Sequence, residues 1–310
     1  MKKNLAKKVT LSILAGAVLM SSSVVWAADI LVDEKVYWTN TSSDEYVRNE
    51  TNNPDGIVPV DTYSPSIFYG AYDASADVSG GKVTINSCTT IEGGVYGGYS
   101  NDGNANENKV TISGSNVGYV YGGYSENKDA NGNIVTITDG KFELVCGGGN
   151  YSKTGSANEN IVTITDAEAD YVCGGCAEGA GSANKNIVTI SGGAVGNVYG
   201  GIAEGAGSAN DNIVNIAGEP NLGYLYGGGS YSGVSSGNVL NIGYDEGVDD
   251  VVGGIDVDER KIWTNGGAVD AIEGFQTINF KNLHWEDGKS VIKVNGSAFL
   301  AGTTIGNISV

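Results

Sequence analysis

The chain has 310 residues, of which 36 are acidic and 17 are basic, so its formal net charge at pH 7 is −19. Such an acidic surface repels phosphate backbones, which argues against a nucleic-acid-binding protein, and it disfavours contact with anionic membranes. An apolar fraction of 40% is too high for a disordered chain, and 49 glycines against 4 prolines favour short strands joined by tight turns.

Residues 1–27 have the composition of a bacterial export signal. Four lysines within the first eight residues precede an uncharged, largely apolar stretch at 9–25, and the small residue Ala27 follows. This pattern predicts cleavage after Ala27. The apolar stretch is short and is interrupted by polar residues, so a cleaved signal is favoured over a membrane anchor. We therefore expect a secreted or cell-surface protein with no transmembrane span, whose mature net charge is −23 (−19 − 4).

Residues 28–66 carry no repeat and contain three of the four prolines. A stack of repeats needs an atypical unit at each end, because the terminal apolar surfaces have to be protected from water. We therefore interpret residues 28–66 as an N-terminal cap.

Two short blocks alternate through residues 67–256. The first has the pattern Asn-x-Val-x-Ile, and its copies begin at Gly81 (a degenerate copy), Asn108, Asn133, Asn160, Asn186, Asn212 and Asn238. The second has the pattern aliphatic-x-Gly-Gly, and its copies begin at Val95, Val120, Val145, Val172, Val198, Leu225 and Val251. Successive copies of the second block begin 25, 25, 27, 26, 27 and 26 residues apart, which indicates a regular structural repeat.

Both blocks are too short for helices and are rich in β-branched residues, so each is predicted to be a strand. Alternation places the Asn, Val and Ile of the first block on one face, and one unit cannot bury that face alone. We therefore predict an all-β protein, a right-handed parallel β-helix of about seven coils with about 26 residues each and atypical caps. A kelch propeller shares the Gly-Gly motif but needs repeats of about 50 residues.

Residues 257–310 lose the period but stay strand-like, as in the segments 275–280 and 291–294. We interpret them as a C-terminal continuation or cap.

The Asn-x-Val-Thr-Ile and Val-Tyr-Gly-Gly elements resemble the Gly- and Asn-rich repeats of bacterial autotransporter passenger domains. The resemblance covers residues 67–310, because segments 272–280 and 288–294 are similar to the part that follows the repeats in such passengers. It implies an adhesin-like protein of the cell surface, associated with the outer membrane. The sequence holds no series of alternating strands of about ten residues, so we expect a passenger that lacks the C-terminal translocator barrel, with a truncated gene product or a soluble relative as the alternatives.

Four cysteines leave three interpretations open. Cys146 and Cys173 replace the tyrosine of the second block in consecutive coils, about 4.8 Å apart, which makes them a candidate disulfide. A pair of buried thiols is the alternative. Cys173 and Cys176 also match the C-x-x-C pattern of redox and metal sites, but that pattern lacks the usual helix and a second ligand pair beyond Cys88 and His284. We expect no metal site and no cofactor.

The second block carries a tyrosine in most of its copies, and these residues form the candidate binding strip: Tyr96, Tyr121, Tyr199 and Tyr226. If the preceding valines point inward, alternation turns these rings outward, where they could stack on a sugar or on a host protein. The alternative is that the rings pack over the Gly-Gly turn.

No catalytic residues are predicted. Lyases and hydrolases built on β-helices combine clustered acids with basic partners, but this chain has only Arg48, Arg260 and His284 besides its lysines, and the acid pair Asp249 and Asp250 has no basic partner nearby in sequence. The sequence favours a non-catalytic, adhesin-like passenger that binds a glycan or a host or matrix protein through its side surfaces. The alternatives are a polysaccharide-active β-helix enzyme, a lyase or hydrolase, and a structural stalk.

Overall fold

The computed structural model describes residues 28–32, 35–40, 45–48, 55, 57–58, 63–64, 67–86, 90–152, 154–218, 220–230, 233, 235–243, 267–280, 292–300 and 302–308. All regular structure among them is β-structure, and none of them is helical. The predicted export signal, Cys88, the acid pair at 249–250, Arg260 and His284 lie outside the described residues.

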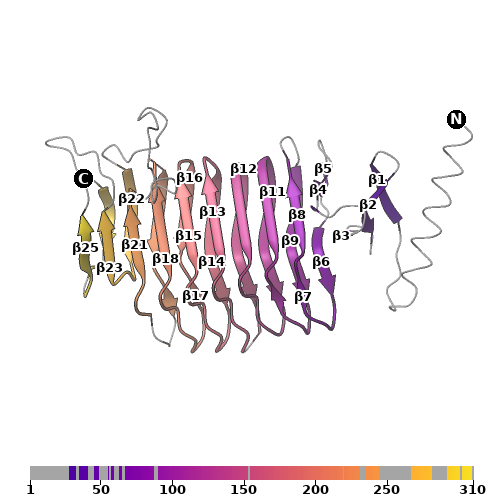
Figure 1. Ribbon diagram of the computed structural model, residues 1–310. Helices are drawn as coiled ribbons and strands as arrows, with labels where there is room; N and C mark the ends of the chain where they lie inside the picture. Colours follow the sequence, from indigo (N-terminus) through magenta and orange to yellow (C-terminus); the bar gives the residue numbers. More distant parts are fainter. Residues whose placement is uncertain are drawn as a thin grey trace, which may run out of the picture.

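Strands of successive coils pair in parallel and in register, and they form a β-solenoid of about seven turns with a spacing of about 26 residues. The predicted fold class is confirmed. Figure 1 shows the strands side by side along one axis, from β6 (Ile67–Asp73) in indigo to β25 (Thr304–Ile308) in yellow. No helix among the described residues has the length and hydropathy needed to cross a membrane.

The first-block strands form one continuous row of parallel pairs. They are β8 (Lys82–Ile85), β11 (Lys109–Ser125), β12 (Ile134–Asn150), β13 (Ile161–Thr165), β15 (Ile187–Ser191), β18 (Ile213–Ala217), β21 (Val239–Ile242), β23 (Thr277–Phe280) and β25. In β11 and β12 the same strand runs on through the second block of its coil.

The second-block strands form the adjoining rows. They are β9 (Thr90–Ser100), the C-terminal parts of β11 and β12, β14 (Glu168–Ala177), β16 (Ala194–Tyr199), β17 (Ile202–Ala203), β19 (Asn221–Tyr226), β20 (Gly229–Ser230), β22 (Gly267–Glu273) and β24 (Ile292–Ala298). A separate small sheet joins β7 (Val78–Ser79) and β10 (Ala105–Asn106) in the loops between coils.

Short strands precede the first regular coil. They are β1 (Ala28–Val32), β2 (Lys35–Asn40), β3 (Glu45–Arg48), β4 (Ile57–Val58) and β5 (Tyr63–Ser64). The first three pair antiparallel as β1–β2–β3, and β3, β4 and β5 then pair in parallel with β6, β8 and β9.

The core is a line of aliphatic side chains along the solenoid axis. Val135, Val162 and Val188 lie opposite one another on successive strands and have no exposed surface. Ile137 and Ile164 form a second such row two residues further along. The inward valines of the second block, such as Val145, close the core from the other side. Each coil therefore buries its apolar face across its own interior and against the coils on either side.

Buried asparagines form a ladder parallel to this core: Asn108, Asn133, Asn160, Asn186, Asn212 and Asn238. The side-chain oxygen of Asn160 accepts hydrogen bonds from the backbone N–H and the side-chain Nδ2 of Asn133, at 2.9 and 3.0 Å. The same pair of bonds recurs along the ladder. The backbone N–H of Asn238 donates to Gln276, whose amide replaces asparagine in the next coil.

Asn160→Ala is expected to lower the free energy of unfolding by about 2 kcal/mol, because it leaves buried N–H groups of Asn133 without an acceptor. Urea unfolding followed by circular dichroism measures the change. Asn197→Ala, in an outward position on β16, is the matched control and should change stability by less than about 0.5 kcal/mol. Equal effects of the two substitutions would contradict a structural role for the ladder.

The last regular coil differs from the sequence alignment. The strand stacked on β19 is β22, which places Ile272 opposite Leu225 in the position that the repeat pattern assigned to Val251. Both residues fit the aliphatic pattern, but Ile272 is followed by Gly274 at the bend and by Gln276 at the asparagine ladder. Residues 244–266 lie outside the described part of the chain.

Candidate functional site

The Gly-Gly pair of the second block bends each coil. A Cβ added at Gly174 would lie 2.3 Å from the carbonyl oxygen of Gly200 in the next coil and 2.6 Å from the Cβ of Asn186. Glycine is therefore required here by the close approach of two backbones. Because the chain turns at this point, outward side chains before and after the bend face each other.

The bend largely covers the tyrosine strip, Tyr96, Tyr121, Tyr199 and Tyr226. Tyr96 stacks on Tyr121 with ring centroids 5.2 Å apart, and Tyr99, from beyond the bend, meets Tyr96 edge-on at 5.4 Å. Tyr199 stacks on Tyr226 at 4.7 Å. Tyr121 is 7% exposed. The exposed strip expected from alternation is thus a mostly packed aromatic layer beside the Gly-Gly bend.

Three cysteine thiols converge within this layer. Cys146 on β12 lies opposite Cys173 on β14. Cys176 follows the Gly-Gly bend of the same coil as Cys173, and its sulfur atom lies beside the other two. The three Sγ atoms, which we call the thiol cluster, all lie within 4.8 Å of one another. All three thiols are free. The Cys146–Cys173 disulfide therefore stays a prediction for the oxidised protein. The sequence pattern paired Cys146 with Cys173 but did not indicate that Cys176 lies next to both.

Hydrogen bonds and burial make the three thiols unequal. The thiols of Cys146 and Cys173 lie 3.0 and 3.1 Å from the carbonyl oxygens of Gly148 and Gly175, to which they donate. Hydrogen bonds from Cys173 and Cys176 lower the pKa of Cys146. Burial raises the pKa of Cys173, and the interaction with Cys146 raises that of Cys176. The interactions among the three thiols therefore make their pKa values differ in direction, lowered for Cys146 and raised for Cys173 and Cys176.

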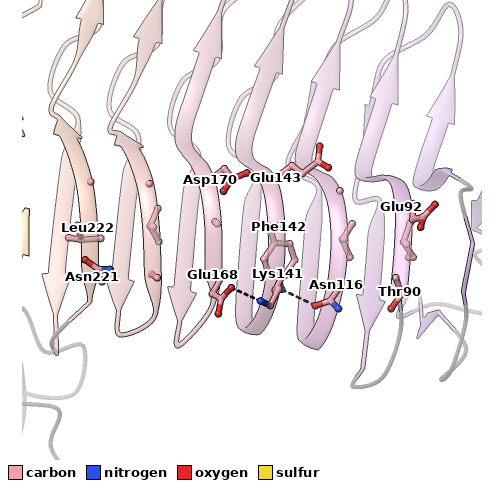
Figure 2. Close-up of a pocket in the computed structure, with 18 of the residues that line it drawn as sticks. Thr90, Glu92, Asn116, Lys141, Phe142, Glu143, Glu168, Asp170, Asn221 and Leu222 are labelled. Carbon is pink, nitrogen blue, oxygen red and sulfur yellow. Dashed lines mark hydrogen bonds and ion pairs between the residues drawn. The ribbon is translucent and has the colours of Figure 1, made fainter. Parts of the chain in front are cut away.

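A groove of about 900 Å³ runs across the coils on the outer surface of the second-block strands. Five acids line it, Glu92, Glu143, Glu168, Asp170 and Asp270, and we call it the acidic groove. Stacking aligns Glu143, Asp170 and Asp270 at one register position in different coils, and Glu92 lies beside this position at a register shift. Figure 2 shows Glu143 and Asp170 at the same level on neighbouring strands.

One lysine lies among these acids. The Lys141 ammonium pairs with Glu168 at 2.8 Å, and its backbone N–H donates to the Asn116 side chain at 3.1 Å (Figure 2). This pair is largely exposed, so it adds little to stability. The acidic groove keeps an excess of negative charge, which should attract cationic ligands and repel anionic ones, and its carboxylates can accept hydrogen bonds from hydroxyl groups.

Exposed tyrosines follow the edge of the acidic groove in every second coil. Tyr119, Tyr171 and Tyr224 share one register position and are 44, 51 and 45% exposed; Leu144 and Asn197 occupy the coils between. We call these three residues the tyrosine row. Two strand spacings separate neighbouring rings, or about 10 Å.

The tyrosine row lies directly beside the acidic groove. The phenol of Tyr119 donates a hydrogen bond to Glu143, and this bond raises the pKa of Tyr119. Tyr171 and Tyr224 directly follow the groove residues Asp170 and Gly223. The sequence contained a signal for this row, because each of the three tyrosines precedes the inward aliphatic residue of a second block.

The described coils define a class of protein: an all-β parallel solenoid with an acidic surface groove, a row of exposed tyrosines and a cluster of three thiols. Comparisons with protein-family models, with curated proteins and with solved structures find no match. The function is therefore argued from these features alone.

Proposed function

We propose that this protein is a non-catalytic, adhesin-like β-helix that is exported to the cell surface and binds an extended glycan along the acidic groove. The observation that carries the proposal is the tyrosine row at the edge of that groove. Contiguous apolar surface marks interaction sites, and these three aligned rings give the groove an aromatic edge.

The spacing of the tyrosine row suits a polymer. Rings about 10 Å apart, at every second coil, match two strand spacings, a length comparable to a disaccharide unit of an extended polysaccharide. A sugar ring can stack on each exposed tyrosine face through its apolar C–H groups. Successive tyrosines of the row would then contact successive disaccharide units of the polymer.

The charges of the acidic groove select among glycans. Carboxylates such as Glu143 and Asp170 accept hydrogen bonds from sugar hydroxyl groups, and they attract protonated amino groups. Sulfated or uronic-acid polymers would be repelled. We therefore expect the ligand to be a neutral or amino-sugar polysaccharide, as part of a host or matrix surface.

Screening an array of glycans with the purified chain tests the proposal. We expect binding to neutral or amino-sugar polymers, and Tyr171→Ala should weaken it about tenfold, the loss of one aromatic stacking contact. Tyr151→Ala is the matched control, since Tyr151 is 53% exposed but packs on Tyr124, away from the groove-lining residues. Affinity that falls equally in both variants, or binding only to sulfated polymers, would contradict the proposal.

A polysaccharide-active enzyme is the second candidate, and one observation favours it. Stacking places the carboxyl groups of Glu143 and Asp170 in adjacent coils of the same groove, and glycoside hydrolysis uses pairs of carboxyl groups. Release of shortened sugars from a bound polymer, if abolished by Glu143→Gln, would show that the protein is such an enzyme and not a non-catalytic adhesin. Absence of both binding and turnover would favour a structural stalk.

A further inference from the structure

The thiol cluster lies within the aromatic layer, in line with Tyr121 and Tyr199, in a group of packed side chains separate from the core valines. Partly buried Leu144, Tyr199 and Ile202 pack around it, together with Tyr121. Cys146 and Cys173 are 0 and 2% exposed. Cys176 is partly exposed, so two of the three thiol side chains are shielded from water and the third is accessible in part.

The residues around the cluster leave room for the sulfur atoms to converge. Gly149 occupies the position that Tyr124 holds in the coil before and Cys176 in the coil after. A Cβ at Gly149 would lie 2.8 Å from the Tyr121 ring, so any side chain there would displace this ring. Glycine at this position lets Tyr121 pack close to the thiols and cover them.

We propose that Cys146, Cys173 and Cys176 form a three-sulfur binding site for a thiophilic metal ion, with Cu(I) as the preferred ion. Thiolate ligands select soft ions such as Cu(I). A planar three-sulfur site with metal–sulfur bonds of about 2.3 Å holds its sulfur atoms about 4 Å apart. The observed Sγ separations, all within 4.8 Å, therefore need only a small contraction.

The ligand set also distinguishes Cu(I) from Zn²⁺. Structural zinc sites have four protein ligands, whereas the group found in the described part of the chain consists of three cysteines with no histidine or carboxylate. A monovalent ion that accepts three sulfur ligands fits this set better. Binding displaces thiol protons to the solvent, because the thiolate is the ligand.

Titration of the reduced whole chain with Cu(I) under anaerobic conditions, in competition with a chromogenic Cu(I) chelator, tests the site. We expect one tightly bound Cu(I) per chain and, in X-ray absorption spectra, three sulfur neighbours around copper. Cys88→Ser, which removes the one cysteine outside the cluster, is the matched control and should keep this ion. Cys146→Ser and Cys176→Ser should each lose it while circular dichroism stays unchanged.

Several results would overturn the proposal. Binding that survives Cys146→Ser, or a sulfur count of two in the Cys88→Ser protein, would show that the three thiols do not act together. Displacement of Cu(I) by an equal concentration of Zn²⁺ would refute the preference for the monovalent ion. Since the sulfur count is measured on the Cys88→Ser protein, the test does not depend on whether the cluster variants fold.

Discussion

Val162→Asp is expected to destabilise the solenoid by at least about 4 kcal/mol, because it buries a carboxylate with no partner in the aliphatic row. Val162 has no exposed surface and lies between Val135 and Val188 of the adjacent coils. In a stacked array each coil is stabilised by its two neighbours, so damage in a central coil weakens both interfaces. Urea unfolding followed by circular dichroism measures the loss.

Thr163→Asp is the matched control, one residue further along the same strand. Thr163 lies on the outer face and is partly exposed, so its carboxylate would stay hydrated and we expect a loss below about 1 kcal/mol. If both aspartates destabilise the protein equally, the assignment of inner and outer faces is wrong.

Gly174→Ala is expected to destabilise the protein by about 3 kcal/mol, at the upper end of what overpacking produces. The added methyl group would meet the Gly200 carbonyl oxygen at 2.3 Å, and that atom belongs to the backbone of the next coil and cannot rotate away. Relief of the contact requires the two coils to separate at the bend. Thermal unfolding of the variant is the measurement.

Gly229→Ala controls for the general effect of replacing glycine. A Cβ at Gly229 would meet no atom within 4 Å, and its backbone conformation is open to any residue. We expect stability to be unchanged or slightly raised, by less than about 1 kcal/mol, because alanine lowers the entropy of the unfolded chain. A Gly174→Ala protein as stable as the Gly229→Ala protein would show that the bend is not tightly packed.

The two outward tyrosine positions show where sequence patterns stop being informative. Alternation places both Tyr119 and Tyr121 outward, since both flank the inward residue Val120. The structure exposes the first and buries the second, because the chain bends at Gly122 and brings Tyr124 against Tyr121. The direction of this bend depends on contacts between coils, which no local pattern contains.

The sequence by itself determined the coil, its period and its core, because stacking in register requires the same residue type at the same place in each unit, as with Val135, Val162 and Val188. Only the tertiary structure decided which distant residues meet. Glu143 and Asp170 lie side by side in one groove, and Cys176 lies within 4.8 Å of the Cys146 and Cys173 sulfur atoms. In the last coil Ile272 occupies the position that the repeat pattern had assigned to Val251. The physical reason is that periodicity specifies position within a coil, whereas sites arise where coils bend and side chains from different coils converge.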